Sequence, residues 1–248
     1  MASPAHRIAG RMRYGAGQLG RMAWFLGHDA AMTRLRRRAE AETGPSDIST
    51  FRPSEPTPDQ RRLFAEIGRL LRTDLANVEA GLYPMPEDRI SLPDLIGRSR
   101  AFFADLPKIH RRRMEKDHQE VFTDDRKGTL PRYYLQNFHY QTDGYLSDDS
   151  ARIYDIQVEV LFKGTASAMR RQALVPIANW MHGRDQRKVS LVDVACGTGR
   201  FLDQIKQAYP LMPVTGVDLS AAYVAEARRH LRRRGQVSLA VANGEHLP

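Results

Sequence analysis

The chain of 248 residues contains a single cysteine, two tryptophans and no long apolar run. One cysteine excludes a disulfide framework and suits a reducing compartment, so we expect a cytoplasmic protein. No stretch approaches the roughly 18 apolar residues that a membrane-spanning helix needs. The arginine-rich start has no apolar signal-peptide core, although its shortage of acids weakly resembles an organelle transit peptide. Cysteine and histidine are not clustered at metal-ligand spacing, so we expect no metal site.

Acidic residues are also in short supply. The chain has 38 Lys and Arg against 29 Asp and Glu, a formal net charge of +9. Arginine clusters lie at residues 36–38, 111–113 and 232–234, and such clusters can bind nucleic acid or anionic lipid. Because each cluster lies on or at the end of a predicted helix, we interpret them as solvated helix faces and do not expect a nucleic-acid partner. A noncatalytic basic module that binds RNA, a membrane or a protein partner is the alternative from another functional class.

The most informative segment is Val189 to Arg200, with the sequence VSLVDVACGTGR. Its first residues form a β-branched apolar run, typical of a strand buried on both faces of a parallel sheet. Gly197 and Gly199 follow at once; lacking a Cβ, they can adopt positive φ and let the backbone approach a ligand at the start of a helix. Asp193, at the carboxyl end of the strand, can accept hydrogen bonds from a cationic or hydroxyl group. The pattern therefore predicts a strand, a glycine turn and a ligand-binding helix start.

Two more strands are predicted after this turn. Residues 200–208 carry a helical apolar face, and residues 214–217 form a second strand that ends at Asp218. Asp218 lies 19 residues after Gly199, near the spacing of roughly 20 at which dinucleotide folds place an acid on ribose hydroxyls. Residues 236–242 alternate into a third strand. The layout predicts a site for an adenosine-bearing cofactor.

These residues resemble the class I S-adenosylmethionine-dependent methyltransferases, most closely the DVACGTG subset that includes quinone and other small-molecule methyltransferases. The resemblance covers about residues 189–248 and implies S-adenosylmethionine as the cofactor and a small-molecule methyl acceptor. It implies that Asp193, Gly197 and Gly199 surround the methionine part of the cofactor, with Ala195 where a first glycine often stands. It further implies that Asp218 holds the ribose, that Leu219 lies on the adenine, and that the strand tip at Asn243 and Gly244 meets the adenine amino group.

The resemblance also sets the expected fold class and raises a question about the ending. The family's sheet usually has seven strands, but only three are predicted before Pro248. We therefore expect an α/β chain with the first three parallel strands of a partial Rossmann-like sheet, preceded by a mainly helical region. We also expect a fragment or truncated product that lacks the acceptor-side wall and, alone, is not active.

The glycine turn has other interpretations, the plainest being a parallel α/β domain without a ligand in which the turn arises by chance. An NAD-type dinucleotide site is a lesser alternative, favoured by the acid after the second strand but opposed by Leu202 in place of a third glycine. A nucleophilic role for Cys196 is a further one, but no helper residue is adjacent, and a small buried cysteine is ordinary in such a turn.

The upstream part predicts a series of helices. Helical periodicity covers Leu19 to about Arg38, and Thr57-Pro58-Asp59-Gln60 is a start signal with Thr57 as N-cap. A further helix is expected from Ser91 to Asp105, and Ser147 is expected to cap another. We divide the chain into a basic N-terminal helix (1–42), a flexible linker (43–56), a helical, aromatic-rich substrate-side or lid region (57–186) and the partial cofactor domain (187–248).

An irregular aromatic segment lies between His118 and Leu146. Long irregular segments inside compact chains often form lids or binding loops, and aromatic faces suit a flat or apolar acceptor. His139 could act as a general base near neutral pH, and Tyr134 and Tyr140 are weaker catalytic candidates. The alternative is that these rings pack the helical layer onto the sheet.

Overall fold

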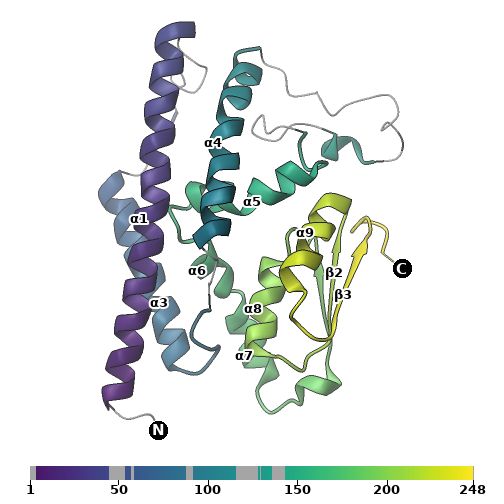
Figure 1. Cartoon of the computed structure of the whole chain (residues 1–248). Helices are drawn as coiled ribbons and strands as arrows, with labels where there is room; N and C mark the ends of the chain where they lie inside the picture. The colour runs from purple at the N-terminus through teal and green to yellow at the C-terminus, as the bar shows by residue number, and fades with distance from the viewer. Residues whose placement is uncertain are drawn as a thin grey trace.

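The protein is described by a computed structural model that covers residues 4–44, 54–56, 59–87, 92–115, 128, 130–135 and 143–247. Figure 1 shows the long helices on one side and a small sheet with its own helices on the other, with α5 and α6 between them. The first part of the chain forms α1 (Pro4–Thr43), α3 (Gln60–Glu79), α4 (Leu92–Glu115), the 3₁₀ turn η1 (Arg132–Tyr134), α5 (Asp148–Leu161), α6 (Ala166–Arg171) and α7 (Leu174–Met181). The second part forms η3 (Gln186–Lys188), β1 (Leu191–Val194), α8 (Arg200–Ala208), β2 (Val214–Asp218), α9 (Ala221–Leu231) and β3 (Val237–Val241).

The sheet has three parallel strands in the order β1-β2-β3, with Leu191 opposite Val214 and Val214 opposite Val237. Leu202 and Ile205 of α8 are completely buried and pack with Val214 in the main apolar core. Parallel strands joined by helices have the βαβ connectivity of a Rossmann-like fold. The predicted α/β class, with a mainly helical region before the sheet, is confirmed.

The burial of β1 differs from the prediction that both of its faces are covered. Val192 and Val194 are 57% and 48% exposed, whereas Leu191 packs against the core that contains α8. Side chains alternate between the two faces of a strand, and α8 lies against only one of them. Within the described residues, an apolar β-branched sequence therefore forms a strand at the edge of the sheet with one face exposed.

The helices of the first part are longer than their sequence patterns predicted. Helix α1 begins at Pro4 rather than near Leu19, and α4 continues past Asp105 through Pro107 to Glu115. Tertiary packing explains the first difference, because Tyr14 is buried and donates a hydrogen bond to α3. Contacts of this kind are invisible to a periodicity count along one helix.

The helix starts confirm the predicted cap at Ser147 and correct the cap predicted for α3. Ser147 accepts a hydrogen bond from the backbone N–H of Ser150, and Ser220 accepts one from Tyr223, as N-cap residues do. For α3 the N-cap is Asp59, which accepts from the N–H of Arg62 at 2.7 Å. The predicted cap Thr57 lies outside the described residues.

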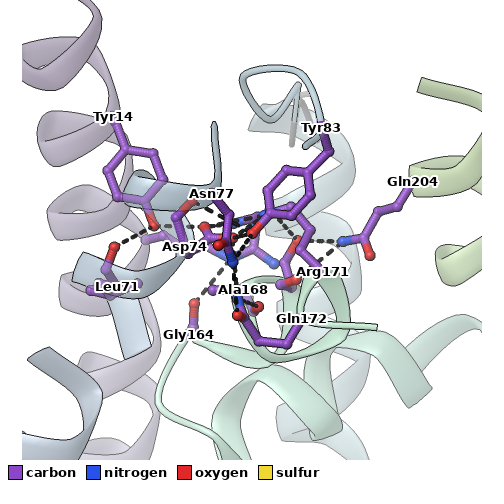
Figure 2. Close-up of polar contacts among 12 residues, drawn as sticks. Tyr14, Leu71, Asp74, Asn77, Tyr83, Gly164, Ala168, Arg171, Gln172 and Gln204 are labelled. Carbon is purple, nitrogen blue, oxygen red and sulfur yellow. Dashed lines mark hydrogen bonds and ion pairs between the residues drawn. The ribbon is translucent and has the colours of Figure 1, made fainter. Parts of the chain in front are cut away.

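A buried polar cluster joins the helical layer to the rest of the molecule (Figure 2). Asp74 of α3 is completely buried and accepts hydrogen bonds from the hydroxyls of Tyr14 (2.6 Å) and Tyr83 (2.8 Å). The guanidinium of Arg171, on α6, pairs with the same carboxylate at 2.6 Å. Burial and the Asp74 charge raise the pKa of Tyr14, and the same two causes raise that of Tyr83 to about 12, so both hydroxyls keep their protons and act as donors.

The cluster extends to the first helix after the glycine turn. Arg171 donates to the Ser167 hydroxyl at 2.9 Å, and the Gln204 side-chain amide of α8 donates to the same hydroxyl at 3.0 Å. Figure 2 shows Gln204 reaching towards the cluster from its own helix. Helices α1, α3, α6 and α8 are thus linked through side chains that are almost entirely removed from water.

Candidate functional site

The glycine turn connects β1 to α8 through left-handed backbone. Ala195, Gly197 and Gly199 have φ values of 61°, 55° and 75°. Gly199 is the N-cap of α8, and a Cβ at this position would lie 2.8 Å from Leu231 Cδ1, on α9. Both φ and close packing require glycine there. The turn places backbone N–H groups at the start of a helix, where anionic and polar ligand groups bind.

Asp218 is connected directly to this turn. Its Oδ2 accepts the N–H of Gly197 at 2.9 Å, and its Oδ1 accepts the N–H of Ser220 at 2.9 Å. The structure thus brings together two residues that the sequence separates by a helix. Each carboxylate oxygen has a second acceptor position, so hydrogen bonds from ligand hydroxyls can be added without breaking these two.

Negative charge accumulates beside the turn. Burial and the nearby Asp218 raise the pKa of Asp193 to about 6, although Arg170 of α6 acts in the opposite direction. Two neighbouring carboxylates favour a bound cation, which would stabilise the ionised form of Asp193. Arg170 was not predicted as part of this region, because no local motif marks it and only the fold brings α6 near β1.

Cys196 lies inside the turn, but its surroundings disfavour a reactive thiolate. It is 8% exposed and packs in the main core. Burial and the charges of Asp218 and Asp193 raise the pKa of its thiol to about 12. A nucleophilic cysteine needs the opposite environment, so the interpretation of Cys196 as a small buried residue agrees with the structure.

The remaining predicted cofactor residues lie at the ends of β2 and β3. Leu219 is half-buried directly after β2. The Asn243 side-chain oxygen accepts the N–H of Glu245 at 3.0 Å, which fixes the side chain at the tip of β3. A Cβ on Gly244 would lie 2.8 Å from Val194 Cγ1, so this tip lies against the end of β1.

Four tyrosines form a ring cluster next to Asp218. Tyr145 and Tyr223 have perpendicular rings with centroids 5.7 Å apart, and Tyr154 contacts both at 6.3 Å and 5.2 Å. Tyr134 stacks at a tilt on Tyr145, with centroids 5.7 Å apart. The cluster is anchored by Ser220, which donates to the Tyr145 carbonyl at 2.5 Å. These rings pack α5 and the segment before it onto α9.

Among the catalytic candidates, the structure describes only Tyr134. Burial and the charge of Asp218 raise the pKa of its hydroxyl, which disfavours the phenolate that a general base would need. His139 and Tyr140 lie outside the described residues. Among the described residues, no His, Cys, Asp and Glu side chains gather as a metal-ligand set, and no helix has the length and apolar character needed to cross a membrane.

With this geometry in place, comparison with known proteins is informative. Residues 191–248, from the first residue of β1 onwards, match the family model described as Methyltransferase domain. A segment of 82 residues is 29% identical to a malonyl-(acyl-carrier protein) O-methyltransferase from Geobacter sulfurreducens, covering 33% of this chain and 31% of that protein. The chain therefore spans about a third of the length of this curated relative.

Three solved structures show a more distant likeness. They are the citrinin polyketide synthase CMeT domain (13% identity, TM-score 0.35, 100% of this chain and 69% of that chain), an O-methyltransferase family protein from Burkholderia thailandensis (15%, 0.30, 75% and 55%) and the CurJ carbon methyltransferase (12%, 0.34, 96% and 66%). Likenesses with TM-scores this low carry no weight for function.

The segment from β1 onwards is thus similar to methyltransferase domains, in agreement with the resemblance of its glycine turn and Asp218. Methyltransferases of this type use S-adenosylmethionine as the methyl donor.

Proposed function

We propose that the protein is an S-adenosylmethionine-dependent methyltransferase and that its cofactor binds at the carboxyl ends of β1 and β2. The observation that supports this most directly is the 2.9 Å hydrogen bond from the Gly197 N–H to Asp218, which makes the glycine turn and the acid after β2 one unit. The charge of the site also fits. The cofactor carries a sulfonium and an ammonium group, and Asp193 and Asp218 lie together with a raised pKa on Asp193.

In this proposal each residue has a distinct task. Gly197 and Gly199 let the backbone approach the methionine part, Asp193 pairs with its ammonium group, and Asp218 accepts the ribose hydroxyls while holding the turn. Leu219 covers one adenine face, and Asn243, beside Gly244, lies near the adenine edge. When bound, the cofactor supplies a methyl group already activated by the sulfonium, so the protein mainly has to align the acceptor.

We infer that the acceptor is small and aromatic or apolar. The tyrosine cluster next to Asp218 supports this, because ring faces and edges bind flat or apolar groups. Tyr134 then serves as a wall of the acceptor site rather than as the base. The acceptor of the Geobacter relative, malonyl-(acyl-carrier protein), is a useful member of an assay panel alongside phenols and quinols.

Titration calorimetry with S-adenosylmethionine and its demethylated product tests the cofactor assignment. Asp218→Ala is expected to weaken binding by about 1–3 kcal/mol, since it leaves buried hydroxyls and the Gly197 N–H without an acceptor. Glu66→Ala, which removes an exposed carboxylate on α3, serves as the control and should bind like the wild type. Equal affinity of wild type and Asp218→Ala, or preferential binding of NAD, would show that the assignment is wrong.

The rival function, a basic module for RNA or membranes, has weaker structural support. Arg234 is paired with Asp203 at 2.7 Å, and Arg36 lies 4.0 Å from Glu40, so part of the arginine excess is used within the chain. Saturable, sequence-selective RNA binding that persists at physiological salt would nevertheless favour the rival, because nonspecific phosphate contacts weaken steeply as salt is raised.

A further inference from the structure

A buried carboxylate on α5 lies against the glycine turn from the protein side. Asp155, which is 8% exposed, accepts a hydrogen bond from the Thr198 hydroxyl at 2.7 Å. The same carboxylate pairs with Arg200, whose Nε and Nη2 lie 2.7 Å and 2.6 Å from Oδ2. Thr198 and Arg200 are the two neighbours of Gly199, the N-cap of α8. One side chain from another helix thus binds the residues on both sides of Gly199.

Asp155 is itself fixed by a wider set of charges. Arg98 of α4 lies 3.9 Å from Asp155, donates to the Arg152 carbonyl at 2.9 Å, and pairs with Glu226 of α9 at 2.6 Å. Burial alone would raise the pKa of Asp155, but Arg200, Thr198 and Arg98 together hold it below its ordinary value. The carboxylate therefore stays ionised at neutral pH, and α4, α5, α8 and α9 are connected through it.

The other hydrogen bonds of the turn are made by its backbone: the Gly197 N–H donates to Asp218, the Cys196 N–H to the Val217 carbonyl and the Gly199 N–H to the Cys196 carbonyl, so Asp155 is the partner that holds the Thr198 and Arg200 side chains. Gly197 and Gly199 have positive φ and populate many conformations when unrestrained. The start of α8 has no side-chain cap, since its N-cap residue is glycine. When a ligand binds to a mobile turn, part of the binding free energy is used to order the turn. A turn that is already fixed does not reduce the affinity in this way.

We propose that Asp155 is a positioning residue that holds Thr198 and Arg200, and with them the glycine turn, in the ligand-binding conformation before the ligand arrives. The inference rests on the proposed function, because it takes the cofactor as the ligand of the turn. It also makes the helical layer a determinant of cofactor affinity, although α5 contributes no residue to the predicted cofactor motif.

The chain offers a matched control on the same helix. Glu159, one turn after Asp155, is also a buried carboxylate paired with an arginine, Arg21 of α1, at 2.6 Å. Arg21 lies in the helical layer and not on the glycine turn. Asp155→Asn and Glu159→Gln therefore remove equivalent charges, and both are expected to lower the melting temperature.

Two measurements separate positioning from stability. Below the melting transitions, Asp155→Asn is expected to weaken binding of the demethylated cofactor roughly tenfold or more, and Glu159→Gln to change it less than about twofold. Hydrogen exchange of residues 196–200 without ligand is expected to become faster in Asp155→Asn and to stay unchanged in Glu159→Gln. The hydrogen-exchange measurement needs no cofactor, so it tests the positioning role independently of ligand binding. If the wild type bound no S-adenosyl ligand, only the proposed function would be refuted.

A second pair of variants covers the case in which Asp155→Asn does not fold. Thr198→Val keeps the Asp155–Arg200 ion pair and removes one hydrogen bond; it is expected to weaken binding about three- to tenfold, whereas Thr198→Ser keeps the hydroxyl and should restore wild-type affinity. The proposal would be overturned if hydrogen exchange and ligand affinity were unchanged in Asp155→Asn. If Asp155→Asn does not fold, the same result in Thr198→Val would overturn it.

Discussion

The pKa of Asp193, about 6, places a titrating group at the centre of the proposed cofactor site. Because burial and Asp218 raise this pKa above its ordinary value, the ionised carboxylate destabilises the ligand-free protein at neutral pH. The same charge attracts a cationic ligand. The ionised Asp193 carboxylate therefore lowers the folding stability and at the same time favours ligand binding.

This conflict gives a prediction in two parts for Asp193→Asn. At pH 7 the variant should melt a few degrees higher than the wild type, since each kcal/mol shifts the melting temperature of a chain of this size by about 2–4 °C, yet it should bind S-adenosylmethionine more weakly. Scanning calorimetry and titration calorimetry measure the two effects.

The pH dependence follows from the same residue. Ligand affinity should be full above pH 6 and should fall as the pH drops through about 6 and Asp193 takes up a proton. Asp193→Asn should lack this step. An affinity that is flat from pH 7.5 to 5 in the wild type, or a variant that binds as tightly as the wild type, would contradict the assigned role.

At the scale of elements, the contact between α9 and the start of α8 depends on one glycine. Gly199→Ala would add a Cβ at a φ of 75° and 2.8 Å from Leu231 Cδ1. We expect it to cost about 1–3 kcal/mol, from left-handed strain and displacement of the Leu231 side chain. Urea denaturation measures the loss.

Ala195→Gly, in the same turn, is the reverse of the Gly199→Ala substitution. It already has a φ of 61°, so Ala195→Gly relieves backbone strain and should leave stability unchanged or raise it by up to about 1 kcal/mol. A pair of variants that both destabilise the protein equally would show that left-handed geometry does not control this turn.

How far the sequence predicts these elements depends on where their partners lie along the chain. The strands, the glycine turn and the cap at Ser147 are set by neighbouring residues, and their patterns predicted them correctly. The start of α1 was missed because the long-range packing of Tyr14 against α3 supports it, and the passage of α4 through Pro107 was missed as well.

The candidate site divides in the same way. Asp218 and the glycines could be found from spacing alone. Asp155 and Arg170 could not, because each lies on a helix that precedes β1 and approaches the turn only in the folded chain. Such residues leave no motif in a single sequence.

At the scale of the whole molecule, the helical layer is joined to the rest through the buried pair of Asp74 and Arg171. Asp74→Asn would leave the Arg171 guanidinium buried without its counter-charge, which typically costs about 3–5 kcal/mol. We therefore expect a fall in melting temperature on the order of 10 °C.

The control for this prediction lies on the same helix. Glu66→Gln breaks an exposed ion pair with Arg69 and should change the stability by less than about 1 kcal/mol. Similar melting temperatures for the Asp74 and Glu66 variants would mean that the buried cluster does not hold the layers together.

The distance along the chain between these partners has a consequence for how the protein is made. Asp74 and Arg171 are 97 positions apart, and Tyr14 is 60 positions before Asp74. At roughly 5–20 residues per second, a ribosome would need about 5–20 s to deliver the arginine after the aspartate. During that interval Asp74 of α3 lacks Arg171, the cation with which it pairs in the folded chain. We therefore expect the helical layer to reach its final packing only after α6 has emerged.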